Sequence, residues 1–184
     1  TFKNWNTNPD GTGATYTNQQ EVNNLTSDNG GTITLYAQWT ANNYTVRFFP
    51  NDNTDNRATG TMSDQVINYD ATTPLTKNTY ARTGYTFKNW NTVTNGTGKT
   101  YTDMQEVRNL TDTNGGTVTL YAQWVANNYK IQYDKNANDA TGNMNDTEAT
   151  YDKPTNLTKN AYSLAGYEFA GWNTKQDGTG TAYI

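Results

Sequence analysis

The feature that most constrains the fold is an internal repeat. Residues 29–39 read NGGTITLYAQW and residues 114–124 read NGGTVTLYAQW, so the two segments differ only at Ile33 and Val118. Near-identical segments at a fixed spacing are typical of tandem structural modules. A catalytic motif seldom needs a second copy at such a spacing. The sequence therefore predicts several small modules of one kind, with this segment as a core strand of the module.

Three copies of the module can be aligned, and only the central one is complete. The central copy covers residues 44–128, the first copy (1–43) has only the second half, and the third copy (129–184) has only the first part. Corresponding tryptophans lie 85, 85 and 82 residues apart in the pairs Trp5–Trp90, Trp39–Trp124 and Trp90–Trp172. The difference arises in the loop after the first strand, where changes of length are tolerated best. Because the chain begins in mid-pattern, we expect it to be part of a longer protein.

Alternating apolar and polar residues predict four strands in the central copy. These strands cover residues 44–49, 65–69, 84–91 and 117–124. The side chains expected to point inward from the first and last of them are Tyr44, Val46, Phe48, Val118, Leu120, Ala122 and Trp124. In the third strand Phe87 is out of phase with Trp90, which predicts a β-bulge or bend between them.

Two short segments are predicted to be helical. In the first, Met104, Val107 and Leu110 lie three residues apart, behind a capping box formed by Thr102 and Gln105. The first copy repeats this pattern with Thr17, Gln20, Val22 and Leu25. In the second segment, Thr73 and Pro74 occupy the N-cap and first helical positions of a predicted helical turn.

The composition argues against several classes of function. Net charge is −4 with only 13 Lys plus Arg and no basic run, so we expect neither nucleic acid nor an anionic membrane as a partner. The chain has no Cys and no His, which excludes disulfides, thiolate chemistry and the commonest general base. No apolar run approaches the length of a membrane span, so membrane insertion is not expected. Aromatic residues make up 13% of the chain, and their large rings can build small cores from few residues.

One segment and the carboxylates are the features of the sequence that could suggest catalysis or a cofactor. The segment GTGKT at residues 96–100 is similar to the end of a phosphate-binding loop, but the other copies read GTGAT and GTGTA and lack the lysine. A glycine turn is therefore predicted there. The carboxylates fall in loops and on the outer surface of the predicted helix, and no triad can form without His. We predict no enzymatic activity and no catalytic residues.

The loops at residues 50–56 and 134–143 are rich in oxygen ligands of the kind that calcium prefers. Neither loop has the pattern of a helix–loop–helix calcium site, and Asn and Asp are ordinary turn residues. We therefore predict no cofactor and no metal, while calcium is kept as an alternative with these candidate ligands: Asp52, Asp55, Asp134 and Asp139.

Binding is the alternative to a purely structural function. Tyr36 and Tyr121 occupy equivalent outward positions among Thr and Gln, where they could stack on sugars or contact a protein. These two residues are the binding candidates. Tyr and Thr are also common on any exposed strand, so the pattern suits a passive surface equally well.

The motif order GY-x-F-x-x-WNT, GTG-x-x-Y and NGG-T-hydrophobic-T-LYAQW resembles the Listeria–Bacteroides repeat, the internalin B-repeat type of module found in bacterial surface proteins. This resemblance implies a strand-dominated α+β fold, with small β-grasp (ubiquitin-like) modules in an extended tandem array. It also implies an adhesin-like spacer or stalk in a secreted or cell-wall-attached protein, located outside the bacterial cell. The family shares no catalytic residues, so none are transferred.

The short linkers at residues 40–43 and 125–128 predict a semi-rigid string of modules. The expected partners are neighbouring repeats or other copies of the chain, with a glycan or a host surface protein in the binding alternative. A half module of about 40 residues buries too little surface to fold alone. The ends could reflect a division within a repeat, a folding unit offset from the sequence period, or completion by strands of another copy in end-to-end assembly.

Overall fold

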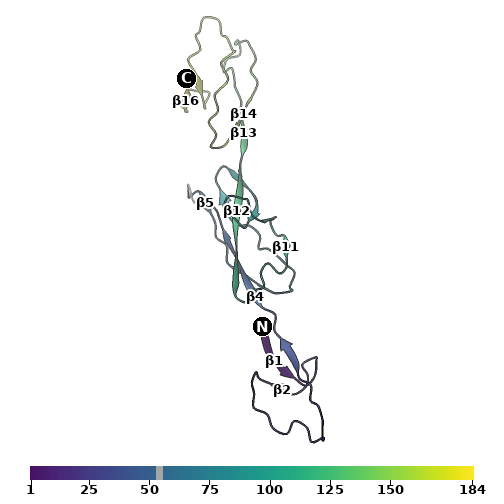
Figure 1. Ribbon diagram of the computed structural model, residues 1–184. Coiled ribbons are helices and arrows are strands. Elements are labelled where there is room, and N and C mark those ends of the chain that lie inside the picture. The colour runs from purple at the N-terminus through teal and green to yellow at the C-terminus, as the bar shows by residue number, and fades with distance from the viewer. Residues whose placement is uncertain (53–55) are drawn as a thin grey trace. The chain divides into compact units, whose positions relative to one another are not determined.

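The computed structural model describes residues 1–52 and 56–184, and every regular element in these ranges is a β-strand (Figure 1). The strands are β1 (Phe2–Asn6), β2 (Thr15–Tyr16), β3 (Tyr36–Trp39), β4 (Asn43–Phe49), β5 (Ala58–Thr59), β6 (Gln65–Asn68), β7 (Thr73–Pro74), β8 (Ala81–Arg82), β9 (Tyr85–Asn91), β10 (Thr100–Tyr101), β11 (Glu106–Val107), β12 (Gly116–Ala126), β13 (Asn128–Ile131), β14 (Thr147–Thr150), β15 (Trp172–Asn173) and β16 (Ala182–Tyr183).

The predicted α+β class with β-grasp modules is wrong, because the described residues contain no helix. The capping-box contact does form, since the Thr102 amide donates to Gln105 Oε1 at 2.9 Å. The chain then leaves the helical path at Met104, whose φ of 56° lies in the left-handed region. The next residues form β11, which pairs antiparallel with β7. The two segments of the central copy that were predicted as helical therefore form one small two-stranded sheet. The corresponding residues 17–25 of the first copy form neither a helix nor a strand, so that prediction is also wrong.

The central copy is built around a seven-stranded sheet of order β5-β8-β9-β12-β4-β6, with β10 attached to β9. Strands β12 and β4 run parallel from the pair Gly116–Tyr44 to the pair Tyr121–Phe49. On its other edge β4 pairs antiparallel with β6. The repeated segment NGGTVTLYAQW thus forms most of β12, the strand between β9 and β4, as predicted for a core strand.

The core of the central copy lies under this sheet. The predicted inward face of β4 is confirmed, and that of β12 only in part, because Val118 and Trp124 are half-buried. Tyr44, Val46, Phe48, Leu120 and Ala122 are buried, as are Ile67, Leu75, Trp90, Tyr101 and Val107 from neighbouring segments. The Trp90 ring lies 4.9 Å from Phe48, 5.0 Å from Phe87 and 6.3 Å from Tyr80. Burial of each large apolar side chain contributes about 1.5–3 kcal/mol to folding.

A bulge before the WN motif was predicted from Phe87 and Trp90 of the central copy, and the first copy shows the corresponding register shift. In the first copy, the β1–β3 pairing shifts register between Phe2 and Asn4. These residues correspond to Phe87 and Asn89 of the central copy. The shift brings Phe2 onto the same face as Trp5, with a ring separation of 5.2 Å.

By its contacts the chain divides into two compact units. One unit comprises Thr1–Ala81 and Phe87–Gln123, and the other comprises Arg82–Thr86 and Trp124–Ile184. The short segment Arg82–Thr86 thus belongs with the third copy, although it lies within the central copy in sequence.

Hydrogen bonds hold this segment in the second unit. The Asn127 amide donates to Gly84 O at 2.9 Å, and Tyr85 Oη donates to Asp152 Oδ2 at 2.9 Å. The Tyr85 and Tyr151 rings meet edge to face at 5.9 Å. Within the unit, β13 pairs with β14 and β15 pairs with β16.

Candidate functional site

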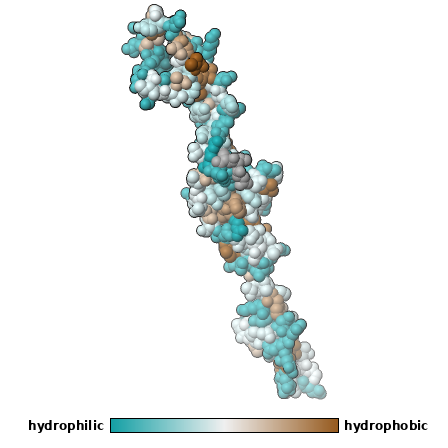
Figure 2. Space-filling view, turned by 90° about the vertical axis from the view of Figure 1, so that its left-hand side faces the viewer, coloured by the Kyte–Doolittle hydropathy of each residue, from teal (hydrophilic) through white to brown (hydrophobic). Residues whose placement is uncertain are grey.

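Two surfaces of the chain could contact a partner. The first is an outward aromatic pair formed by Phe49 of β4 and Tyr121 of β12, whose rings are stacked at 5.7 Å with an interplanar angle of 25°. Phe49 is 42% exposed, and Tyr121 is half-buried against it. A flat exposed pair of this kind can stack on an apolar sugar face or on another ring. The face of the molecule in Figure 2 is largely hydrophilic, with small hydrophobic patches.

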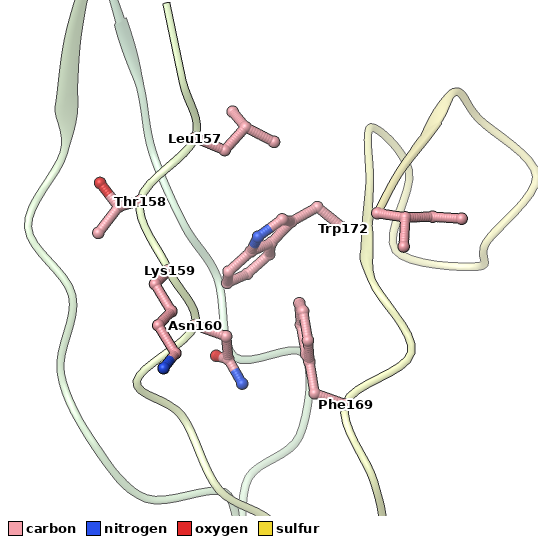
Figure 3. Close-up of a pocket in the computed structure, with 7 residues that line it drawn as sticks. Leu157, Thr158, Lys159, Asn160, Phe169 and Trp172 are labelled. Carbon is pink, nitrogen blue, oxygen red and sulfur yellow. The ribbon is translucent and has the colours of Figure 1, made fainter.

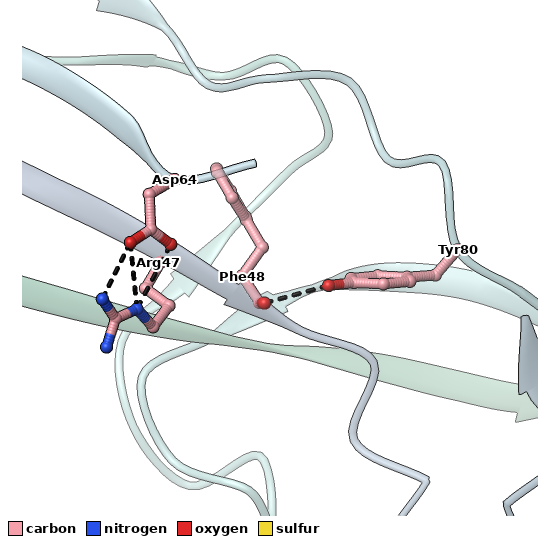
Figure 4. A network of polar contacts seen from close by, with 4 residues as sticks. All are labelled: Arg47, Phe48, Asp64 and Tyr80. Carbon is pink, nitrogen blue, oxygen red and sulfur yellow. Dashed lines mark hydrogen bonds and ion pairs between the residues drawn. The ribbon is translucent and has the colours of Figure 1, made fainter. Parts of the chain in front are cut away.

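The polar neighbour of the aromatic pair is already engaged in an ion pair (Figure 4). Arg47 Nε donates to Oδ1 and Oδ2 of Asp64 at 3.2 and 3.1 Å, and Arg47 Nη2 donates to Oδ2 at 2.8 Å. These hydrogen bonds lower the pKa of the Asp64 carboxyl and raise the pKa of Arg47. Beside this pair, Tyr80 Oη donates to the Phe48 carbonyl at 3.0 Å, which ties the loop after β7 to β4.

The structure places the two predicted binding residues on different sheets and does not bring them together. Tyr36 is 40% exposed and lies in the three-stranded sheet of order β2-β1-β3. Tyr121 lies in the seven-stranded sheet and has Phe49 as its neighbour. Binding by either residue stays a prediction.

Two of the four candidate calcium ligands accept backbone hydrogen bonds. Asp52 Oδ2 accepts a hydrogen bond from the Ala58 amide at 3.0 Å, and Asp134 Oδ1 accepts one from the Asn136 amide at 2.7 Å. Asp139 is exposed, and Asp55 lies outside the described residues. In residues 1–52 and 56–184 no group of three or more acidic side chains is placed to hold a metal. Calcium binding stays an untested alternative.

The GTGKT segment is a turn organised by the side chain of Asn91, a residue that the sequence analysis missed. Asn91 is 1% exposed, and its amide nitrogen donates to Gly96 O, Gly98 O and Thr100 Oγ1 at 3.0–3.1 Å. Its Oδ1 accepts from the amides of Val93 and Gly98 at 2.9 and 3.0 Å. Lys99 Nζ lies 5.2 Å from the centre of the Tyr101 ring instead of facing a phosphate loop.

The same arrangement occurs in the other two copies. Asn6 makes the corresponding five contacts, and Asn173 makes four of them. Glycine is required at the position of Gly98, because a Cβ there would lie 2.3 Å from Thr92 Oγ1. The signal that could have revealed this role is the recurrence of WNT followed by GTG in every copy.

The second candidate surface is a groove of about 1300 Å³ in the third copy, lined by aromatic and apolar residues together with about as many polar and charged ones. The Trp172 ring lies in it, 4.7 Å from Tyr133 and 4.9 Å from Phe169. An adjoining pocket of about 410 Å³ is shown in Figure 3, where Leu157, Phe169 and Trp172 converge. The mixed lining offers both apolar and polar contacts and selects no one class of ligand.

One polar group in the groove is held firmly. Tyr133 Oη accepts a hydrogen bond from the Thr158 amide at 2.7 Å and lies 2.9 Å from Thr147 Oγ1. Burial would raise the pKa of Tyr133, but these hydrogen bonds lower it on balance. The hydroxyl thus links β14 to the segment around Thr158.

Comparison with known proteins gives one matching family and two similar proteins of one organism. A family model described as the Listeria-Bacteroides repeat domain matches residues 44–123 and 129–184. A protein of Evansella cellulosilytica, provisionally named a Gly-rich membrane protein, is 34% identical over 172 residues, which is 93% of this chain and 19% of that protein. A second protein of the same organism, provisionally named a membrane protein, is 39% identical over 155 residues, or 81% of this chain and 20% of its own length.

The chain thus spans about a fifth of the length of these relatives. No solved structure matches it. The described residues include no helix that could cross a membrane.

Proposed function

Because the chain belongs to the Listeria-Bacteroides repeat family, we propose that it is a structural repeat segment of a larger bacterial surface protein, where it serves as a spacer or stalk. The proposed location is outside the cell, in or on the cell envelope. The names of the two relatives refer to membrane proteins, which fits a protein of the envelope. The proposal includes the absence of enzymatic activity.

The observation that supports this function is that the repeated residues serve folding. Trp90 and Leu120 of the central copy are fully buried, and Asn91 is used entirely in holding a turn. The equivalent residues in the other copies make the same kinds of contacts, as Asn6 and Asn173 do. A chain that repeats its core and its turns, without repeating a polar cluster in a cleft, is suited to a mechanical role.

Deletion of one complete repeat from the parent protein tests the proposal. Removal of residues 44–128 joins equivalent points of two repeats, so the remaining repeats should still fold. We expect unchanged surface display, measured with an antibody to the distal part of the parent protein, and a shorter distance of that part from the cell. Loss of a specific binding or enzymatic activity with the display unchanged would contradict a spacer function.

The exposed Phe49–Tyr121 stack favours a second candidate function, the binding of a carbohydrate or host protein. A glycan array with the intact chain tests it. If the stack binds sugars, Tyr121→Ala removes the signal, because the stacking surface is lost. Val66→Ala is the matched control, since Val66 is an exposed apolar residue on β6, away from the stack. Equal loss in both variants, or no binding by the wild type, would exclude this function.

A further inference from the structure

Each linker between copies contains an asparagine that bonds to the copy before it and to the copy after it. In the second unit this residue is Asn127, whose amide donates to Gly84 O at 2.9 Å. Its Oδ1 accepts a hydrogen bond from Thr86 Oγ1 at 2.7 Å. Gly84 and Thr86 belong to the central copy by sequence. The Asn127 carbonyl accepts a hydrogen bond from the amide of Tyr151, in the third copy, at 2.8 Å.

Asn42 occupies the equivalent position in the first linker, which lies inside the other unit. Its carbonyl accepts a hydrogen bond from the amide of Tyr69, in the central copy, at 2.7 Å. Its Nδ2 donates to Asp112 O of the central copy at 2.9 Å. Its Oδ1 accepts a hydrogen bond from Thr1 Oγ1 of the first copy at 2.6 Å. The same arrangement thus forms at two separate linkers.

The packing of two rings stabilises the contact in the second unit. The Tyr85 ring meets the Tyr151 ring edge to face at 5.9 Å, and Tyr85 Oη donates to Asp152 Oδ2 at 2.9 Å. Gly84 lies so close to the Tyr151 ring that an added Cβ would be 2.2 Å from it. A segment moves freely only where it has few such contacts. These contacts therefore oppose bending at the linker.

We propose that Asn42 and Asn127, the junction asparagines, make each linker a fixed joint between successive repeats instead of a hinge. The partner that each linker binds is the next repeat of the same chain. Asparagine suits this position because its side-chain amide offers a donor and an acceptor together. In Asn42 the acceptor serves the first copy and the donor serves the central copy.

The inference deepens the proposed spacer function and rests on it. Repeats joined at fixed angles extend in proportion to their number, whereas freely hinged repeats extend only as about the square root of their number. Fixed joints therefore give a spacer a greater reach per repeat.

The test measures the distance between the first and central copies by double electron–electron resonance of two spin labels. The chain has no cysteine, so labels on the double variant Lys3→Cys/Lys88→Cys lie only at these two exposed positions. The distance distribution of this parent should be narrow. Asn42→Ala removes both side-chain hydrogen bonds and should broaden the distribution by about twofold or more, because the linker then behaves as a hinge.

The neighbouring asparagine provides the matched control. Asn43 contacts the central copy through its backbone amide and carbonyl, which alanine retains, so Asn43→Ala should leave the distribution narrow. Asn42→Asp is a second test variant, because it keeps the acceptor for Thr1 but loses the donor to Asp112 O. It should broaden the distribution as well. Equal widths in Asn42→Ala and Asn43→Ala, or a broad distribution in the parent, would overturn the proposal.

Amide hydrogen exchange tests the second linker. The amide of residue 127 donates to Gly84 O, so its exchange rate reports on the joint directly. Asn127→Ala should speed this exchange by about two- to tenfold, because the bond to Thr86 is lost. Asn128→Ala is the control, since its Oδ1 accepts only from Thr150 within the third copy. Equal exchange rates in the two variants would contradict the assigned role of Asn127.

Failure of this inference can be told apart from failure of the spacer function. Broad distances in the parent would make the spacer a flexible tether but would leave it a spacer. The spacer function itself is tested by the deletion of residues 44–128.

Discussion

Replacement of Gly84 by alanine should disrupt the packing of the segment Arg82–Thr86 within the second unit. Gly84 has a φ of 79°, and a Cβ there would lie 2.2 Å from the Tyr151 ring. The left-handed backbone alone costs a residue with a Cβ about 1–2 kcal/mol. Overpacking against a ring adds about 1–3 kcal/mol. The total expected destabilisation is therefore about 2–5 kcal/mol.

The chain offers a matched control at Gly166, the equivalent position of the third copy. Gly166 has a φ of 81°, and a Cβ there would meet nothing within 4 Å. Gly166→Ala should therefore carry only the backbone cost of about 1–2 kcal/mol. The difference between the two variants isolates the clash with Tyr151.

Amide hydrogen exchange measured by NMR resolves the effect locally. The Asn127 amide donates to Gly84 O at 2.9 Å, and the Tyr151 amide donates to Asn127 O at 2.8 Å. Displacement of the Tyr151 ring should strain both bonds, so both amides should exchange faster in Gly84→Ala than in Gly166→Ala. Equal protection of the two amides in both variants would refute the reasoning.

Three further predictions concern the central copy. Asn91→Ala should destabilise it by about 2–4 kcal/mol in urea denaturation, because the backbone groups that Asn91 binds lose their partner. Asn95→Ala is the control and should cost much less, because it removes only exposed hydrogen bonds to Thr97. Trp90→Ala should lower the free energy of unfolding by about 3–5 kcal/mol, because Trp90 is fully buried. Trp39 is 70% exposed, so Trp39→Ala should have little effect on stability. Similar losses of stability in the two variants would contradict the assigned core. The pKa values of Asp64 and Asp70 are lowered, by hydrogen bonds from Arg47 and from Asn109 with Arg108 respectively. Such groups stabilise the fold above the unfolded-state pKa of about 3.8, and their contribution disappears as the pH falls through the lower folded-state pKa. Arg47→Gln should therefore reduce the loss of stability on acidification below about pH 4, as measured by thermal unfolding at several pH values.

Strands with clear alternation could be predicted from sequence because each residue's side-chain direction is a local property. Tyr44, Val46 and Phe48 repeat with a period of two and are all buried. The bulge before Trp5 was also predictable, since an out-of-phase ring in an apolar strand requires a shift in register. The repeat itself identified the family, because the motif order is specific.

Residues 102–110 show where local reasoning fails. Spacing of three in Met104, Val107 and Leu110 is compatible with a helix, and the capping contact at Thr102 does form. The β7 segment, about thirty residues earlier in the chain, nevertheless offers a ladder to Glu106–Val107. A helix of so few residues is marginal by itself, so the tertiary partner decides its conformation.

The sequence by itself determined the repeat, the inward face of each long strand and the absence of thiol and imidazole chemistry, because these depend only on residue type and order. Only the tertiary structure decided that the short segments are strands, that Asn91 is a buried organiser of its turn, and that Phe49 stacks on Tyr121. The physical reason is that pairing and burial depend on which distant segment lies alongside. A strand's own sequence specifies its faces, but the neighbours on its edges come from elsewhere in the chain.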